Sequence, residues 1–161
     1  MGLFGLFKTT EEKIANAICD KAVSLVKEVG VNASSLRGKY GDSTDKIAIA
    51  YGAALIAHAN GIIFERTEGK YPNVLTITSK NLGALYEMVK ACIAKEKEWN
   101  YDYDKNFYAN SHGWCMEWAR ETIALNGFDS ADVDYLMQIF APYMHTMGNF
   151  TKELLESMGL W

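Results

Sequence analysis

A histidine and a cysteine lie three residues apart in the segment His112-Gly-Trp-Cys115. On a helix this spacing places both side chains on one face, so an imidazole and a thiol could meet there. Cys115 could then act as a nucleophile with His112 or His145 as its base, provided that the start of a helix stabilises the thiolate. These three residues are the catalytic candidates, and the chemistry would be that of a small cysteine-dependent hydrolase or transferase.

Two other roles for Cys115 compete with catalysis. The His–Cys pair could form half of a zinc site, but the chain has no second pair of these residues at ligand spacing. The thiol could also pack beside Trp114 and Trp118 as a small core residue. We expect the core role, because the three cysteines (Cys19, Cys92 and Cys115) are odd in number and far apart, which is typical of reduced thiols in a cytosolic protein.

The segment Asp102-Tyr103-Asp104-Lys105-Asn106 resembles the first half of an EF-hand calcium loop. The resemblance covers five residues and then stops. The sixth loop position holds Phe107 where the family has glycine, and the twelfth holds Gly113 where it has a bidentate glutamate. We expect turn formers and helix caps here, and neither a bound metal nor a cofactor. The calcium candidates are Asp102, Asp104 and Asn106.

Aromatic residues concentrate around this acidic loop. Aromatic density beside carboxylates, without a basic cluster, is typical of a protein-binding surface or of a pocket for an apolar or sugar-like ligand. Nucleic-acid stacking would require lysine or arginine nearby. The structural alternative is a second core layer that holds the loop in place. The candidate binding residues are Trp99, Tyr101, Tyr103, Phe107, Tyr108 and Trp114.

Four polar residues recur at every seventh position: Thr44, Tyr51, His58 and Glu65. A single helix through all four would align them as one stripe, with Tyr51 and His58 about 10 Å apart along the axis. At that separation the two side chains could line a pocket or a proton path. The alternative, which we favour, is that they meet solvent or a carbonyl group of a neighbouring helix. Tyr51 and His58 complete the candidate binding residues.

These candidates must be positioned by helices, and the most distinctive segment is the uncharged run at residues 47–64. Its small residues alternate with bulky ones, which predicts a helix at residues 44–60 buried among other helices. The length would also permit a membrane span. However, Asn60-Gly61 is a favourable helix C-terminus, and no Lys/Arg cluster flanks the run. We therefore expect the central helix of a water-soluble, cytoplasmic protein.

The remaining pattern predicts a mainly α fold. A capping box at Thr9 and Glu12 opens an amphipathic helix that Gly30 should end. β-Branched residues at 62–67 and 74–78 predict a hairpin. Further helices are expected at residues 79–99, 111–125 and after Asp129, with a last short one at 150–158. The expected architecture is one domain, residues 1–161, in which five or six helices surround the Ala-rich helix and a small β-hairpin (62–78) is inserted.

Composition narrows the function only in part. The 161 residues are 49% hydrophobic and 22% charged, as in an ordinary folded domain. A net charge of −4 without a basic cluster argues against phosphate-driven nucleic-acid binding. Because no catalytic motif is complete, we expect a non-catalytic interaction or regulatory module that forms homo-oligomers through the aromatic loop or the apolar tip at residues 1–8. Membrane contact by this tip is a lesser alternative. The cysteine enzyme and a carrier of small apolar ligands are the alternative functions.

Overall fold

The computed structural model describes residues 8–83, 85–98 and 107–161. In these ranges the chain forms α-helices and one short 3-10 helix, and no strand, so the predicted mainly α fold class is confirmed. The elements are α1 (Thr10–Asn32), η2 (Ser34–Leu36), α2 (Arg37–Tyr40), α3 (Ser43–Arg66), α4 (Val74–Leu82), α5 (Leu85–Glu98), α6 (Phe107–Leu125) and α7 (Ser130–Ser157).

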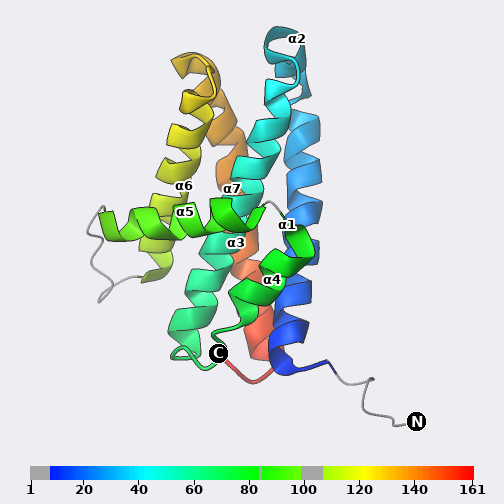
Figure 1. The fold of residues 1–161 in the computed structure, drawn as a ribbon, viewed down its shortest axis with the longest axis vertical. Helices are drawn as coiled ribbons and strands as arrows, with labels where there is room; N and C mark the ends of the chain where they lie inside the picture. Colours follow the sequence, from blue (N-terminus) through cyan, green and yellow to red (C-terminus); the bar gives the residue numbers. More distant parts are fainter. Residues whose placement is uncertain (1–7, 84, 99–106) are drawn as a thin grey trace.

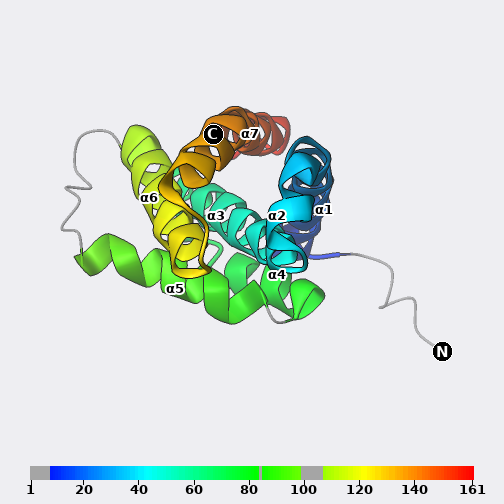
Figure 2. The ribbon, with the colours of Figure 1, turned by 90° about the horizontal axis from the view of Figure 1, so that it is seen from above.

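Helix α3 occupies the centre of the fold. It contacts α1, α2, α5, α6 and α7, and Figure 1 shows it upright between α1 and α6. Seen from above in Figure 2, α7 lies on one side of α3, while α4 and α5 form a layer on the opposite side. Helix α5 runs across the upright helices, and α4 packs against α1. The Ala-rich helix is therefore central, as the sequence predicts.

The burial of α3 explains its composition. Every residue from Tyr51 to Ala59 is buried, and these nine positions cover all sides of the helix. Small alanine and glycine side chains allow neighbouring helices to approach from several directions at once. By length and composition α3 could also cross a membrane, but 78% of its most apolar window is buried inside the described structure. Core helices of soluble proteins have this same property.

Two predicted helix ends are wrong, and both were placed at glycine. The capping box of α1 is present, with the Glu12 N–H donating to Thr9 Oγ1 at 3.1 Å. However, α1 continues through Gly30 to Asn32. Helix α3 likewise continues through Gly61 to Arg66, because Ile62 and Ile63 are buried in the core. In α3 the burial of these two isoleucines outweighs the local preference of Gly61 for a helix end.

The predicted β-hairpin at residues 62–78 is also wrong. Residues 62–66 are the last turn of α3, and residues 74–78 lie in α4. In α4, Val74 and Thr78 are buried one helical turn apart, and Thr78 Oγ1 donates a 2.8 Å hydrogen bond to the Val74 carbonyl. Threonine can satisfy its hydroxyl in this way within a helix. β-Branched composition therefore misled the prediction, since packing against α1 decides the local structure.

The number of helices also differs from the predicted five or six, since the described ranges contain seven α-helices. Gly83 is the first residue after α4, and its φ of +58°, which glycine adopts readily, ends the helix there.

At the other end of the chain, Gly148 and Asn149 do not interrupt α7, which runs for 28 residues and includes Pro142. Gly148 is buried, so close packing explains its presence there.

The short helix α2 is attached to the start of α7. Lys39 Nζ forms ion pairs with the carboxylates of Asp129 and Asp132, the latter at 2.6 Å. The Tyr40 hydroxyl donates to the Asp132 carboxylate at 2.5 Å, and its ring lies 4.1 Å from that of Phe128 between centroids. We call these five residues the α2–α7 clasp. It fixes the end of α1 and the beginning of α3 relative to α7.

Candidate functional site

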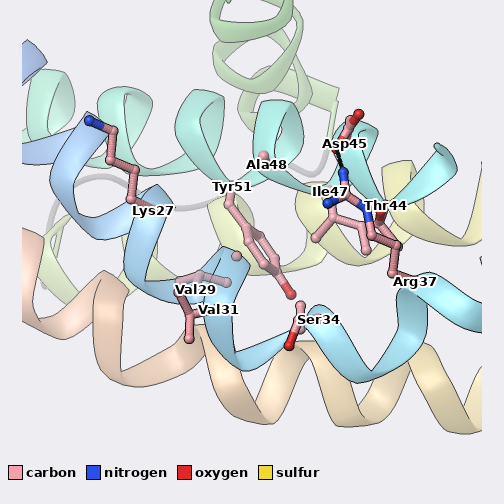
Figure 3. A pocket seen from close by; sticks show the side chains of 12 residues that line it. Lys27, Val29, Val31, Ser34, Arg37, Thr44, Asp45, Ile47, Ala48 and Tyr51 are labelled. Atoms are coloured by element: carbon pink, nitrogen blue, oxygen red, sulfur yellow. Dashed lines mark hydrogen bonds and ion pairs between the residues drawn. The ribbon is translucent and has the colours of Figure 1, made fainter. Parts of the chain in front are cut away.

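A cleft lies between α1 and α3 and consists of two compartments. The upper compartment, near α2, has a volume of about 440 Å³. This volume falls in the range of about 300 to 1,000 Å³ that small-molecule pockets occupy. Its walls come from the last turns of α1, from η2 and α2, and from the first two turns of α3. Figure 3 shows Tyr51 projecting from α3 toward Ser34, with Ile47 and Ala48 on the α3 side.

The lower compartment lies closer to α4 and α5. Its volume is about 240 Å³, and its lining is apolar apart from one lysine. Lys27 of α1 and Ala48 of α3 line both compartments. The lower lining residues are Ala22, Val23, Val26, Lys27, Ala48, Gly52, Ile56, Leu82 and Leu85.

Gly52 lines the lower compartment without a side chain of its own. A Cβ atom built at this position would lie 3.6 Å from Val26 Cγ2 and 3.7 Å from Leu85 Cδ2. These are ordinary van der Waals distances, so an alanine would fit without displacing its neighbours. A larger side chain would occupy space that is now empty. The cleft therefore depends on small residues of α3 facing larger ones of α1 and α5.

Tyr51 forms an inner wall of the upper compartment and is fully buried. Its hydroxyl donates a 2.7 Å hydrogen bond to the main-chain carbonyl of Leu136 in α7. Its ring stacks on Phe140, with centroids 3.9 Å apart and planes inclined by 12°. Burial raises the pKa of Tyr51 well above its ordinary value, so it stays neutral. Of the roles considered from the sequence for this residue, contact with a carbonyl group of a neighbouring helix is the one that this hydrogen bond provides.

Charged side chains stand at both ends of the upper compartment. Arg37 of α2 and Asp45 of α3 form a 3.0 Å ion pair at one end, and Lys27 lies at the other (Figure 3). All three are exposed, so solvent screens their interactions. The hydroxyl groups of Ser34 and Thr44 add polar groups to the same lining. An apolar cavity bordered by a few polar groups is the usual construction of a small-molecule site.

Among the catalytic candidates, Cys115 is fully buried in α6. Its Sγ lies 3.9 Å from Sγ of Cys92 in α5, so two thiols face each other in the core. Trp118 is also buried. This environment is the one expected for a core thiol. All three cysteines are unbridged, as predicted, and Cys19 is buried in α1.

The histidine candidates lie on three different helices. His145 is exposed on α7, whereas His58 is buried in α3 with 1% of its surface exposed. For His112 the structure describes the helical backbone of α6 only. The extension of α3 to Arg66 places Thr44, Tyr51, His58 and Glu65 on one helix. The catalytic role of Cys115 stays a prediction.

Most of the aromatic and metal candidates lie outside the described residues. This applies to Trp99, Tyr101 and Tyr103 and to the calcium candidates Asp102, Asp104 and Asn106. Phe107, Tyr108 and Trp114 belong to α6, of which only the backbone is described at these positions. Within residues 8–83, 85–98 and 107–161, no three His, Cys, Asp or Glu residues come together as metal ligands. The predicted aromatic interface and self-association stay predictions.

Of the residues that line the cleft, Thr44 and Tyr51 were singled out from the sequence and the others were not. Lys27, Ala48 and Gly52 are separated along the chain from Leu82 and Leu85, and only the fold brings them together. One signal was available, since Gly52 lies inside a predicted helix, where glycine costs stability of about 1 kcal/mol relative to alanine. Such a glycine commonly marks a close approach or an open space.

Comparison of the chain with protein-family models, with curated protein sequences and with solved structures found no match.

Proposed function

We propose that this protein binds a small ligand with an apolar body in the α1–α3 cleft. The single observation that carries the proposal is the lower compartment, an open cavity lined by eight apolar residues and one lysine. A cavity of this kind retains its exposed apolar surface only at a cost in free energy, and a ligand that covers the surface removes that cost. Of the three functions considered from the sequence, the carrier of small apolar ligands is the one that this geometry supports best.

The surroundings of the cleft support the proposal. Val23 and Ile49, on the two helices that form it, keep 38% and 43% of their surfaces exposed. Tyr51 and its bond to Leu136 hold the inner wall at a fixed distance from α7. A site with rigid walls loses little conformational entropy when a ligand enters, which favours binding. The cleft also adjoins the layer of α4 and α5, which supplies Leu82 and Leu85.

A neutral fluorescent probe tests this function directly. N-phenyl-1-naphthylamine should bind the wild-type protein with a rise in fluorescence at micromolar concentrations. The variant Gly52→Leu places a side chain in the lower compartment and should weaken probe binding about tenfold or more. Gly52→Ala should have a smaller effect, because its Cβ makes only ordinary contacts.

The control for added apolar bulk is Ala124→Leu, at an exposed position of α6 outside the cleft lining. It should leave the affinity unchanged. Circular dichroism of each variant establishes that the fold is retained, and Gly52→Ala provides a folded variant even if Gly52→Leu unfolds. The proposal would be wrong if the folded wild-type protein failed to bind the probe. It would also be wrong if filling the cleft in a folded variant left the affinity unchanged.

A further inference from the structure

We propose that the ligand of the α1–α3 cleft is a single-chain amphiphile with an anionic head group. The head group lies in the upper compartment between Lys27 and Arg37, and the apolar chain passes Ala48 into the lower compartment. This inference rests on the proposed ligand-binding function and specifies its ligand class. Three observations support it: the contrast in polarity between the compartments, the sign of the charge, and the shape of the cleft.

The two compartments differ in the groups that a ligand would meet. Besides apolar side chains, the upper lining contains Lys27, Arg37 and Asp45 together with the hydroxyls of Ser34 and Thr44. Below Lys27 and Ala48, the lower lining contains only apolar residues. A ligand that is polar at one end and apolar along the rest of its length matches a polar upper compartment followed by an apolar lower one. A uniformly apolar ligand would make no polar interaction with the charged and hydroxyl groups of the upper compartment.

The charge of the upper compartment selects an anion. The charged side chains in its lining are two cations, Lys27 and Arg37, and one carboxylate, Asp45. The lining is therefore positive, although the whole chain has a net charge of −4. Asp45 is engaged by Arg37, which leaves the positive charge of Lys27 in excess within the lining. Figure 3 shows Lys27 and Arg37 at opposite ends of the compartment, with the Arg37 guanidinium directed at Asp45, so the lining offers an anionic head group chiefly the charge of Lys27. This complementarity favours a carboxylate or a phosphate over a cationic head.

The shape of the cleft suits an extended chain. Its α3 wall includes Thr44 at the upper end and Ile56 at the lower end. These positions are about 18 Å apart along a helix axis. Ala48, which lines both compartments, has only a methyl group, and Gly52 follows one helical turn later. Small residues at these two positions leave room for a chain to lie along α3.

Three ten-carbon probes with different head groups test the inference: decanoate, decanol and decylammonium. Titration calorimetry below their micellar concentrations should give the highest affinity for decanoate and the lowest for decylammonium. Lys27→Gln should weaken decanoate binding about three- to fivefold, the range typical of an exposed ion pair. It should leave decanol binding unchanged. Lys13→Gln, at another exposed lysine of α1, is the matched control and should affect neither probe.

A second variant should strengthen binding, which unfolding cannot imitate. Asp45→Asn removes the carboxylate that pairs with Arg37 and so raises the net positive charge of the compartment. It should increase the affinity for decanoate but not for decanol. Decyl phosphate, tested in parallel, separates the two anionic head groups, since the tighter of the two identifies the preferred class.

The outcomes distinguish this inference from the proposed function. Equal binding of decanol and decanoate, with no effect of Lys27→Gln or Asp45→Asn, would overturn the anionic head group and leave the apolar site intact. Absence of binding by all the probes, together with absence of N-phenyl-1-naphthylamine binding, would overturn the proposed function itself.

Discussion

The hydroxyl of Tyr51 donates a hydrogen bond to the main-chain carbonyl of Leu136, 85 positions further along the chain, at 2.7 Å. This bond connects the buried centre of α3 to α7, and the stacking of Tyr51 on Phe140 reinforces the same contact. It also sets the position of the inner wall of the upper compartment, since Tyr51 lines that cavity. One buried residue therefore contributes both to the packing of two helices and to the shape of the cleft.

Replacing Tyr51 with phenylalanine should lower the free energy of unfolding by about 1 kcal/mol, the usual net contribution of one hydrogen bond. The ring and its stacking on Phe140 should remain, so the change isolates the hydroxyl. Urea denaturation measures the effect. The control is Tyr143→Phe, which removes an exposed bond donated by Asn32 Nδ2 at 2.8 Å. A loss for Tyr51→Phe no larger than that of the control would contradict the importance of the buried bond.

The α2–α7 clasp should make stability depend on pH at both extremes. The hydrogen bond from Lys39, with that from the Asp132 N–H, lowers the pKa of Asp129 from 3.8 to about 2. A lowered pKa stabilises the folded protein above the unfolded value, and the benefit disappears as pH falls from about 3.8 to about 2. Hydrogen bonds to Asp129 and Asp132 raise the pKa of Lys39 above its ordinary 10.5. Its contribution is complete below pH 10.5 and disappears as pH rises above that value.

Lys39→Gln tests this dependence. The stability difference between wild type and variant, measured by urea denaturation, should be constant between about pH 5 and pH 9. It should shrink below pH 3.8. Lys46→Gln, at an exposed position of α3, is the control and should show no such change. A difference that does not vary between pH 6 and pH 2.5 would show that the ionisation of Asp129 beside Lys39 contributes nothing to stability.

Cysteine alkylation separates the core role of Cys115 from the catalytic one. Cys92 and Cys115 have no exposed surface, and Cys19 has 8%. Burial, together with the nearby charge of Asp20, raises the pKa of the Cys19 thiol and so lowers its reactivity. In the native protein all three should react with iodoacetamide about tenfold or more slowly than in urea, with Cys92 and Cys115 the slowest. Mass spectrometry of the alkylated peptides gives the order, and a fast reaction at Cys115 would instead favour the cysteine enzyme.

The sequence predicted the centre of the fold better than its edges. The run of small apolar residues around Tyr51 predicted a helix buried on all sides, and burial of this run is what the structure shows. The predicted end of this helix at Asn60 is wrong, because it rests only on the local preference of Gly61 for a helix C-terminus. Ile62 and Ile63 are buried against other helices, and their burial stabilises an extra turn. The same kind of error produced the hairpin, since Val74 and Thr78 have strand propensity but form one buried face of α4.

The cleft could not be predicted in the same way. Its lower compartment requires Val26 of α1 to face Gly52 of α3 beside Leu85 of α5, and no local pattern specifies that meeting. Periodicity identifies which residues of a helix are apolar, but it does not identify which of them will lack a neighbour. For Cys115, in contrast, the sequence already favoured a core thiol over a catalytic one, and the residue is buried.

The α2–α7 clasp has a consequence for how a ligand would enter. Moving α2 outward would break two ion pairs of Lys39, two hydrogen bonds of the Tyr40 hydroxyl and a ring contact with Phe128. On the opposite side, the lower compartment is bordered by the aliphatic side chains of Leu82 and Leu85, which flank the turn at Gly83. Rotation of these side chains breaks no polar interaction of their own. The α2 end of the cleft should therefore be its rigid end, and the side bordered by Leu82 and Leu85 should widen more easily around a long chain.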